Sequence, residues 1–453
     1  MPEWVVMTVG LNPLPCLVEA YRICALVRER TGQLPQFLVF TGGRDYEADQ
    51  IHKGLLNKLS EAGGKLSLKW YAESLPDPFD PGSICRTAKD KLPEFLSTTD
   101  TIHYPYTGGT KAMSLHVYEA LREFGAKKVI SSYLNPAEHK LLSSSPDECS
   151  PGDERTAWRL STYDLAQLHS FRMNHPKPVD PAVEAFAVSM LAALIGGEHE
   201  GFTRWLGKEW KRAFGGSSEK DVWIDRFNRW PHPPVSVPWY EGNSSNWATL
   251  SDRLAAIPAF GKEKVFSRTS GGTWHIQICE PVKHFIIPLY HFLDNQSLEI
   301  YAYSTIRKLL PPDCEVLHSV HFAEVGSGND CELDVVAILG YQLVAISCTL
   351  SSNYGQCKKK GFEIIHRARQ IGGDHARAAV LCLLNDHKRN DLESELKKDM
   401  GLSNDKHFRV FGITSLADVG GQDRKLATTL KNYLGELKWL DVLPVRQAPP
   451  VVR

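Results

Sequence analysis

Apolar and polar positions along the first third of the chain predict strands that alternate with amphipathic helices. Short apolar runs typical of strands occupy residues 4–9, 37–41, 66–71, 101–106 and 128–133. Between them, apolar residues recur at helical spacing over residues 17–30, 49–62, 88–97 and 110–124. A regular succession of strand and helix is typical of an α/β fold built on a doubly wound parallel sheet. We therefore expect one α/β domain over residues 1–165.

The last third of the chain predicts a different order of elements. Residues 297–310 have helical periodicity, and short strands are predicted at 316–323, 331–338 and 343–349, two of which would form a hairpin. A basic helix with Lys358, Lys359 and Lys360 follows, and residues 378–384 form a further predicted strand. This order predicts a second α/β domain over residues 291–445.

The middle of the chain has the composition of a linker followed by a tryptophan-rich region. Serine and proline runs between residues 143 and 180 indicate a crossing between domains. Six of the eleven tryptophans then lie between residues 205 and 247, among several Lys and Arg. Such side chains could stack on bases and neutralise phosphates, or they could fill a small core. Residues 180–290 are therefore predicted to be a middle or linker domain with either role.

Composition narrows the class of protein. A chain of 453 residues is longer than one core usually supports, and its formal charge of -1 argues against coating nucleic acid through bulk charge. Ten scattered cysteines without a C-x-x-C pair argue against a zinc ribbon or a secreted disulfide scaffold. The N-terminus resembles a strand rather than a signal peptide, and the apolar helix predicted at 182–195 is too short to span a bilayer. We expect a cytoplasmic protein that does not bind a membrane.

The strand at 101–106 runs directly into a Thr-Gly-Gly-Thr-Lys turn and a helix, and this junction is suited to bind an anion. Glycines allow a ligand to approach the backbone, and the first helical N–H groups and the helix dipole favour negative charge. The turn lacks the spacing of a Walker A loop, and no G-x-G-x-x-G follows the first strand, which disfavours a triphosphatase and a dinucleotide cofactor. The same residues could equally be a glycine turn that caps an ordinary helix.

With an Asn-Pro turn after the first strand, this Thr-Gly-Gly-Thr-Lys element resembles the CRISPR-associated Rossmann fold (CARF) sensor domain. The resemblance implies a Rossmann-like sheet that binds a cyclic oligoadenylate, with cyclic tetra-adenylate the expected ring, across the two-fold axis of a homodimer. It implies that the ligand is bound by Thr107, Gly108, Gly109, Thr110 and Lys111, with Asn12 and Arg44 nearby.

Two carboxylates in the last third predict a cation site. Glu332 and Asp334 are two residues apart on a predicted strand, so their side chains lie on the same face. Paired carboxylates suit a hard divalent cation, which can activate water and stabilise the charge that develops on a phosphodiester. A pair of exposed acids on an edge strand is the alternative.

The order of helix, three strands, helix and strand resembles the PD-(D/E)xK nuclease fold, a restriction-endonuclease-like α/β domain. The resemblance implies Glu299, Glu332 and Asp334 as ligands of Mg²⁺ or Mn²⁺. That family ends its third strand with Glu-x-Lys, whereas Ser347 and Thr349 stand in those places here.

The next helix offers replacements for the missing Glu-x-Lys. Lys360 and Glu363 share a helical face, and if that face looks onto Asp334 the lysine and the acid have moved to the helix. A solvated basic helix is the alternative.

The sequence thus predicts a homodimeric sensor joined to a metal-dependent nuclease that cuts DNA, RNA or both. By resemblance, it would be a cyclic-oligoadenylate-activated ancillary nuclease of type III CRISPR antiviral defence, with Asp334, Glu332, Lys360 and Glu363 in the catalytic site. The alternatives are a degenerate nuclease fold that binds nucleic acid or a partner without cutting, and a nucleotide-binding regulator whose C-terminal domain only dimerises.

Overall fold

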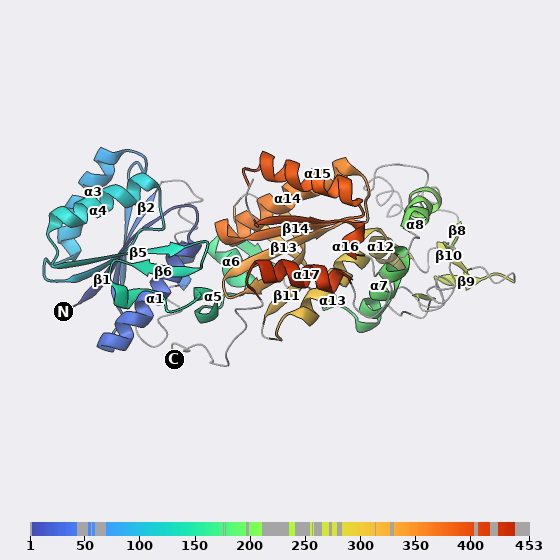
Figure 1. Ribbon diagram of the computed structural model, residues 1–453, viewed down its shortest axis with the longest axis horizontal. Coiled ribbons are helices and arrows are strands. Elements are labelled where there is room, and N and C mark those ends of the chain that lie inside the picture. Colours follow the sequence, from blue (N-terminus) through green and yellow to red (C-terminus); the bar gives the residue numbers. More distant parts are fainter. Residues whose placement is uncertain are drawn as a thin grey trace.

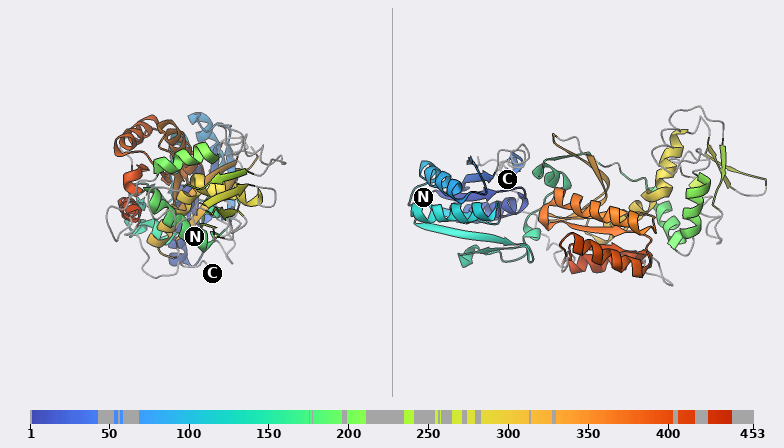
Figure 2. Two further views of the ribbon diagram at one scale, coloured as in Figure 1. Left: turned by 90° about the vertical axis from the view of Figure 1, so that its right-hand side faces the viewer. Right: turned by 90° about the horizontal axis from the view of Figure 1, so that it is seen from above.

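The computed structural model confirms the predicted α/β class. It describes residues 2–42, 53–55, 57–58, 69–174, 176, 178–195, 199–210, 235–240, 254–255, 257, 265–270, 274–278, 283–312, 314–326, 330–402, 406–416 and 425–439. Two six-stranded sheets with their helices lie one after the other along the long axis, and a smaller three-stranded sheet lies at the far end from the N-terminus (Figures 1 and 2). Within the described residues, no helix has both the length and the apolarity needed to cross a membrane.

The N-terminal unit is built on a sheet of strand order β3-β2-β1-β4-β5-β6. Its elements are β1 (Glu3–Val9), α1 (Leu14–Thr31), β2 (Gln36–Gly42), β3 (Trp70–Leu75), α3 (Pro81–Phe95), β4 (Thr101–Pro105), α4 (Lys111–Phe124), β5 (Lys128–Asn135) and β6 (Lys140–Ser143). The first five strands are parallel, but β6 pairs antiparallel with β5. The sequence prediction missed this edge strand, which follows β5 through a connection too short for a crossover. Most of the helix predicted at 49–62 lies outside the described residues.

The central strands β1, β2 and β4 of this sheet are buried on both faces. Val5 and Met7 of β1 pack in one apolar cluster with residues of α1. Their neighbours Trp4 and Val6 point the other way and pack with α3 and α4. The carboxyl ends of β1 and β4 therefore lie together between these layers, where the Asn-Pro and Thr-Gly-Gly-Thr-Lys turns begin.

The C-terminal unit contains the predicted order of helix, three strands, helix and strand. It comprises α13 (Ser297–Leu309), β11 (Glu315–Glu324), β12 (Asp330–Leu339), β13 (Gln342–Cys348), α14 (Tyr354–Gly372), η8 (Gly373–His375), β14 (Arg377–Leu381), α15 (Asp386–Asp399), β15 (Phe408–Phe411), α16 (Ile413–Leu416) and α17 (Lys425–Glu436). The strand order is β15-β14-β13-β12-β11-β7. Strands β11, β12 and β13 form an antiparallel meander, and β14 and β15 add in parallel.

The stretch predicted as a linker is largely structured. It contains η1 (Pro146–Glu148), α5 (Glu154–Ala157), α6 (Thr162–Leu168) and β7 (Phe171–Met173). Strand β7 pairs antiparallel with β11 and so forms the edge of the C-terminal sheet. An apolar cluster continues from α1 through α6 to α14 and joins the two units.

The middle segment shares its core with the C-terminal unit. Its described elements are α7 (Pro181–Ala193), α8 (His199–Trp205), η3 (Leu206–Trp210), β8 (Val235–Pro238), β9 (Phe266–Arg268), β10 (Trp274–Ile278), α12 (Lys283–His291) and η7 (Phe292–Gln296). Trp205 and Trp239 are buried with ring centroids 5.2 Å apart, in the same apolar cluster as β12 and β13. These two tryptophans are therefore packing residues, whereas Trp223, Trp230 and Trp247 lie outside the described residues.

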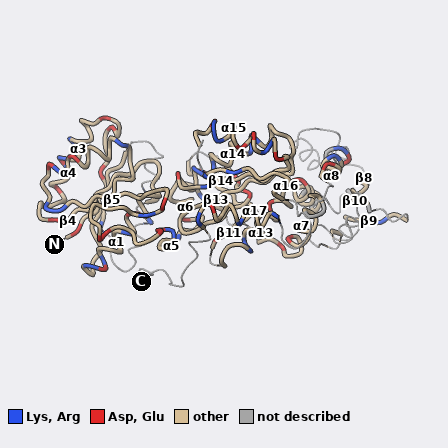
Figure 3. The backbone as a smooth tube through the Cα atoms, in the orientation of Figure 1, with Lys and Arg blue, Asp and Glu red and all other residues tan. Residues whose placement is uncertain are grey.

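Charged side chains of both signs are interspersed over both units (Figure 3). This distribution agrees with the nearly neutral sequence. Any recognition of phosphate must therefore come from local groups rather than from the field of the whole molecule.

Candidate functional site

The turn between β4 and α4 is fixed by its own hydroxyl groups. The Thr110 hydroxyl caps α4, because it accepts a hydrogen bond from Met113 N at 3.1 Å and donates one to the Pro78 carbonyl at 2.8 Å. The Thr107 hydroxyl accepts a hydrogen bond from Leu134 N at 2.9 Å. The helix-cap interpretation therefore applies to Thr110, while the first turn of α4 still presents its N–H groups at the same place.

Packing against β1 requires both glycines of this turn. Gly109 has a φ of +75°, in the left-handed region that favours glycine. A Cβ atom on Gly108 would lie 2.1 Å from Cys16 Sγ and 2.4 Å from the Thr8 carbonyl oxygen. Thr8 Oγ1 also donates a hydrogen bond to the Gly108 carbonyl at 2.8 Å. The glycines thus seat the turn on the end of β1 and leave its outer side for a ligand.

A cavity of about 600 Å³ opens beside the turn. Of the predicted ligand residues, Thr107, Gly109 and Lys111 line this cavity. The other lining residues are Tyr104, Tyr106, Ser114, Leu115, Tyr118, Ser131 and Tyr133. The Tyr106 and Tyr133 rings are stacked, with centroids 5.6 Å apart and an interplanar angle of 18°. Aromatic faces bind nucleobases by stacking, and a lysine with helix N–H groups suits phosphate. Sequence reasoning missed these tyrosines, although the His-Tyr-Pro-Tyr run before the turn contains two of them.

Two predicted ligand residues remain, Asn12 and Arg44. Asn12 is at the boundary with the C-terminal unit, where its Nδ2 donates a hydrogen bond to Asp374 Oδ2 at 3.0 Å. Arg44 lies outside the described residues. Asn12 therefore contacts the other unit of the same chain, and its predicted contact with a ligand remains a prediction.

A buried carboxyl group lies next to the turn. Glu19 of α1 is fully buried, and burial raises its pKa to about 8 despite the opposing effect of the nearby Thr107. Burial raises the pKa of Tyr106, and the charge that Glu19 carries when ionised raises it further. At neutral pH Glu19 is therefore mainly protonated.

In the C-terminal unit, Asp334 is held at the point where β12 and β13 pair. Its Oδ2 accepts hydrogen bonds from Ser347 Oγ at 3.0 Å and from Cys348 N at 2.6 Å. The Ser347 hydroxyl therefore orients the Asp334 carboxylate and adds no charge beside it. Asp334 is 6% exposed, and burial together with the nearby Glu299 carboxylate raises its pKa to about 7.

Lys360 of α14 lies among the predicted acids. Burial lowers the pKa of Lys360, but Asp334, Glu363 and Glu299 outweigh that effect and raise it. Lys360 in turn lowers the pKa of Asp334. Lys360 and Asp334 therefore lie close enough for each to shift the pKa of the other, and the replacement of the missing Glu-x-Lys by the helix stays a prediction.

The other two predicted carboxylates have separate neighbours. Glu332 is half-exposed and accepts a hydrogen bond from Ser319 Oγ, with His321 Nε2 at 3.6 Å. Glu299 Oε2 lies 3.5 Å from Nε2 of the buried His318. Neither His318 nor Ser319, whose φ is +51°, was anticipated from the sequence. Such a backbone angle within a strand is a feature of strained sites.

The donor set fits Mg²⁺ or Mn²⁺ only in part. In the described parts of the chain, no three His, Cys, Asp or Glu side chains are grouped so that they could hold a metal ion. Mg²⁺, however, is commonly held by one or two carboxylates together with water and substrate phosphate. The Glu299 carboxylate is close enough to Asp334 to raise its pKa, so Asp334 and Glu299 are the residues that could hold such an ion.

A second cavity of about 590 Å³ opens beside Lys360 and Glu363. Its lining comes from the start of α14 and the segment directly after β13, and from α8, η3, α12 and η7 of the middle segment. The lining residues are Phe202, Thr203, Leu206, Tyr290, Asp294, Asn295, Thr349, Leu350, Ser351, Gln356, Lys359, Lys360 and Glu363. The middle segment therefore helps to shape the space in which a substrate would meet Lys360.

The two sheets and the order of their elements define a protein with two α/β units, the first with a largely parallel sheet and the second with a mixed one. No family model and no curated protein sequence matches this chain. Solved structures nevertheless share its fold over almost the whole length.

Protein VC1899 from Vibrio cholerae is 14% identical in sequence, and the alignment covers 97% of this chain and 98% of that one with a TM-score of 0.61. Can2 from Sulfobacillus thermosulfidooxidans, solved in complex with cyclic tetra-adenylate, is 13% identical, with 97% and 99% of the chains covered and a TM-score of 0.57. At such low identity these likenesses show a common fold.

Proposed function

We propose that this protein is a metal-dependent nuclease of CRISPR defence that is activated by a cyclic oligoadenylate. The observation that carries the proposal is Lys360, which lies among Asp334, Glu299 and Glu363 beside a large cavity. The fold shared with Can2, whose structure contains cyclic tetra-adenylate, supports a ligand of that class. In this proposal, the N-terminal unit is the sensor and the C-terminal unit is the nuclease.

The sensor cavity has the chemistry that adenylates require. Tyr106 and Tyr133 offer aromatic faces for adenine, and Lys111 with the first turn of α4 offers donors for phosphate. A ring of phosphates with two-fold symmetry would be bound by the same residues from two copies of the chain. We therefore propose a homodimer and cyclic tetra-adenylate as its activator.

In the nuclease unit, each residue has a distinct proposed role. Asp334 and Glu299 would hold Mg²⁺ or Mn²⁺, and Ser347 keeps the Asp334 carboxylate in place through its hydrogen bond. A bound ion of this kind polarises a phosphodiester and activates water. Lys360 would stabilise negative charge that develops on the scissile phosphate.

Two predicted site residues remain, Glu363 and Glu332. Glu363 lies one helical turn after Lys360, raises its pKa and lines the same cavity. Glu332 stays a predicted ligand whose carboxylate is bonded to Ser319.

One observation favours the alternative of a non-cutting protein. Ser347 and Thr349 replace the Glu-x-Lys of the nuclease family, so the acid that this family places on the third strand is replaced by a hydroxyl. In that case the cavity beside Lys360 would bind nucleic acid, or a partner, under control of the same messenger.

Cutting assays separate these possibilities. Single- and double-stranded DNA and RNA are incubated with the protein, with Mg²⁺ or Mn²⁺, and with cyclic tri-, tetra- or hexa-adenylate. Ring-dependent cutting that is lost in Asp334→Ala and kept in Asp330→Asn, an exposed aspartate of the same strand, supports the nuclease. Ring-dependent binding without cutting supports the alternative, and absence of ring binding contradicts the sensor.

A further inference from the structure

Helix α14 connects the candidate nuclease site to the sensor unit within one chain. Its first half carries Lys360 and Glu363, which line the nuclease cavity. Its last residue, Gly372, is followed at once by η8, which lies against the N-terminal unit. From Lys360 to Gly372 an α-helix is about 18 Å long, at about 1.5 Å for each residue. A regular helix of this length moves as a rigid rod.

The first contact of η8 with the sensor is made by the Asn-Pro turn. Asn12 Nδ2 donates a hydrogen bond to Asp374 Oδ2 at 3.0 Å. Gly373 has a φ of +64°, and a Cβ atom there would lie 2.5 Å from Asn12 Oδ1. The end of α14 and the Asn12 side chain are therefore in direct contact, so that a displacement of one acts on the other.

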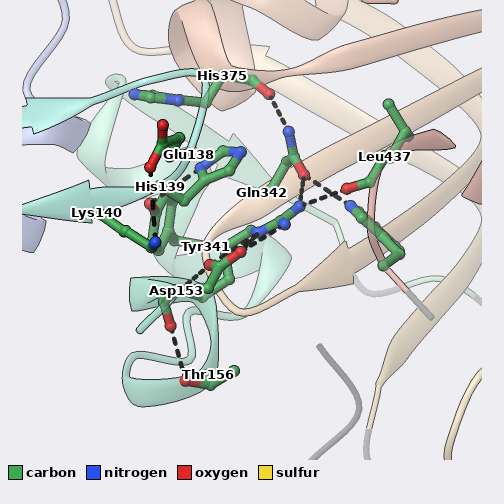
Figure 4. A network of polar contacts seen from close by, with 11 residues as sticks. Glu138, His139, Lys140, Asp153, Thr156, Tyr341, Gln342, His375 and Leu437 are labelled. Atoms are coloured by element: carbon green, nitrogen blue, oxygen red, sulfur yellow. Dashed lines mark hydrogen bonds and ion pairs between the residues drawn. The ribbon is translucent and has the colours of Figure 1, made fainter. Parts of the chain in front are cut away.

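The second contact is made by the turn between β5 and β6 (Figure 4). His139 Nδ1 lies 3.1 Å from the Tyr341 hydroxyl, and the His139 and His375 rings have centroids 5.5 Å apart. Gln342, next to Tyr341, donates its Nε2–H to the His375 carbonyl at 3.0 Å. His139 belongs to the sensor turn and His375 belongs to η8. Tyr341 and Gln342 lie where β12 turns into β13.

The buried Arg155 fixes the other side of this network. It donates a hydrogen bond to Gln342 Oε1 at 2.6 Å and one to the Leu437 carbonyl at 3.0 Å, and it pairs with Asp153 at 2.7 Å. The hairpin turn between β12 and β13 is thereby held to the linker and to the C-terminal region. Through Gln342 this anchor also reaches His375, so η8 lies between the anchored hairpin and the two sensor turns.

Both sensor turns are attached to the walls of the ligand cavity. The Asn-Pro turn begins at Gly10, where a Cβ atom would lie 3.2 Å from Gly109 Cα of the Thr-Gly-Gly-Thr-Lys turn, called the TGGTK turn from here on. The His139 turn follows β5, whose Ser131 and Tyr133 line the cavity. A ligand that moves either wall therefore acts on η8 through a chain of direct contacts.

We propose that α14 is the element through which the sensor controls the nuclease site. A ligand in the cavity beside the TGGTK turn shifts the Asn12 and His139 turns, these shift η8, and α14 changes the position of Lys360 and Glu363 relative to Asp334. Asn12 and Asp374 act here as positioning residues. The inference rests on the proposed function and adds its regulation within each chain.

The test removes the Asp374 acceptor and asks whether ligand binding and nuclease activity become uncoupled. Asp374→Ala loses the hydrogen bond to Asn12, Asp374→Asn keeps an acceptor oxygen, and Asp391→Ala removes an exposed aspartate of α15 as a matched control. Cyclic tetra-adenylate is the probe. For each protein we measure ring affinity, the ratio of cutting with and without the ring, and hydrogen exchange of residues 354–375 with and without the ring.

Allosteric coupling typically changes an affinity or equilibrium about 5- to 150-fold. We expect Asp374→Ala to reduce the ring-dependent stimulation at least about tenfold and to abolish the ring-dependent change in exchange of residues 354–375, while it still binds the ring. Asp374→Asn should restore most of both effects, which a general loss of stability would not do.

The possible failures are distinguishable. Wild-type stimulation in Asp374→Ala, or an exchange of residues 354–375 that the ring leaves unchanged in the natural protein, overturns the inference and leaves the proposed function intact. A ring that changes this exchange without any cutting overturns the nuclease but supports the coupling. A protein that binds no ring overturns the sensor and the inference together.

Discussion

The buried Glu19 makes a strong prediction about the dependence of stability on pH. Its carboxyl group lies fully buried beside the TGGTK turn, and burial raises its pKa from an ordinary 4.5 to about 8. The unfolded chain therefore loses this proton at lower pH than the folded chain does. The stability that comes from this group is fully present below pH 4.5 and is lost as the pH rises to about 8.

The magnitude follows from the difference between the two pKa values. Each pH unit between them changes the free energy of unfolding by about 1.4 kcal/mol, so that the whole interval corresponds to about 5 kcal/mol. Glu19→Gln keeps a neutral side chain of the same shape and removes this titration. The variant should gain stability relative to the natural protein at about 1.4 kcal/mol for each pH unit across the interval.

Denaturant unfolding followed by circular dichroism, at several pH values between 4.5 and 8, measures the difference between the two proteins. Glu29→Gln, an exposed glutamate of the same helix, controls for the chemical change. A difference between Glu19→Gln and the natural protein that does not vary with pH would refute the reasoning, because Glu19 would then titrate alike in the folded and unfolded chains.

Three further predictions concern the same turn and its cavity. Gly108→Ala places a Cβ atom against the Thr8 carbonyl and Cys16, so that the free energy of unfolding should fall by about 1–3 kcal/mol and the melting temperature with it; unchanged melting would contradict the packing described. Lys111→Gln should weaken cyclic tetra-adenylate binding about tenfold or more in calorimetry, whereas Lys127→Gln, between the far end of α4 and β5, should not. Tyr106→Ala should weaken the same binding by about 1–3 kcal/mol for each stacked base, and Tyr106→Phe should retain it; equal losses in both would argue against stacking.

Most of the main elements could be predicted because their apolar periodicity is local. The strands and helices that frame the TGGTK turn, and the order of helix, strands and helix around Asp334, appear within a few residues of their predicted bounds. The edge strands β6 and β7 were missed, since each is short and is defined by its partner rather than by its own pattern. The middle segment was predicted to be a middle or linker domain, and its described apolar residues share a core with β12 and β13, a contact that the sequence pattern does not reveal.

The residues of the candidate sites also fall into two groups, those that a local sequence pattern could select and those that only the fold brought together. Residue type and spacing were enough to select the TGGTK turn, Asp334 and Lys360, because a turn, a strand alternation and a helical face are local properties. Only the tertiary structure placed four tyrosines around the turn, bonded Ser347 to Asp334, set His318 beside Glu299 and turned Asn12 towards Asp374. These contacts join residues from different elements, and in most of these cases the residues are far apart in the chain. The sequence by itself therefore determined which groups are candidates for the chemistry, and the packing of the two sheets decided which of them meet.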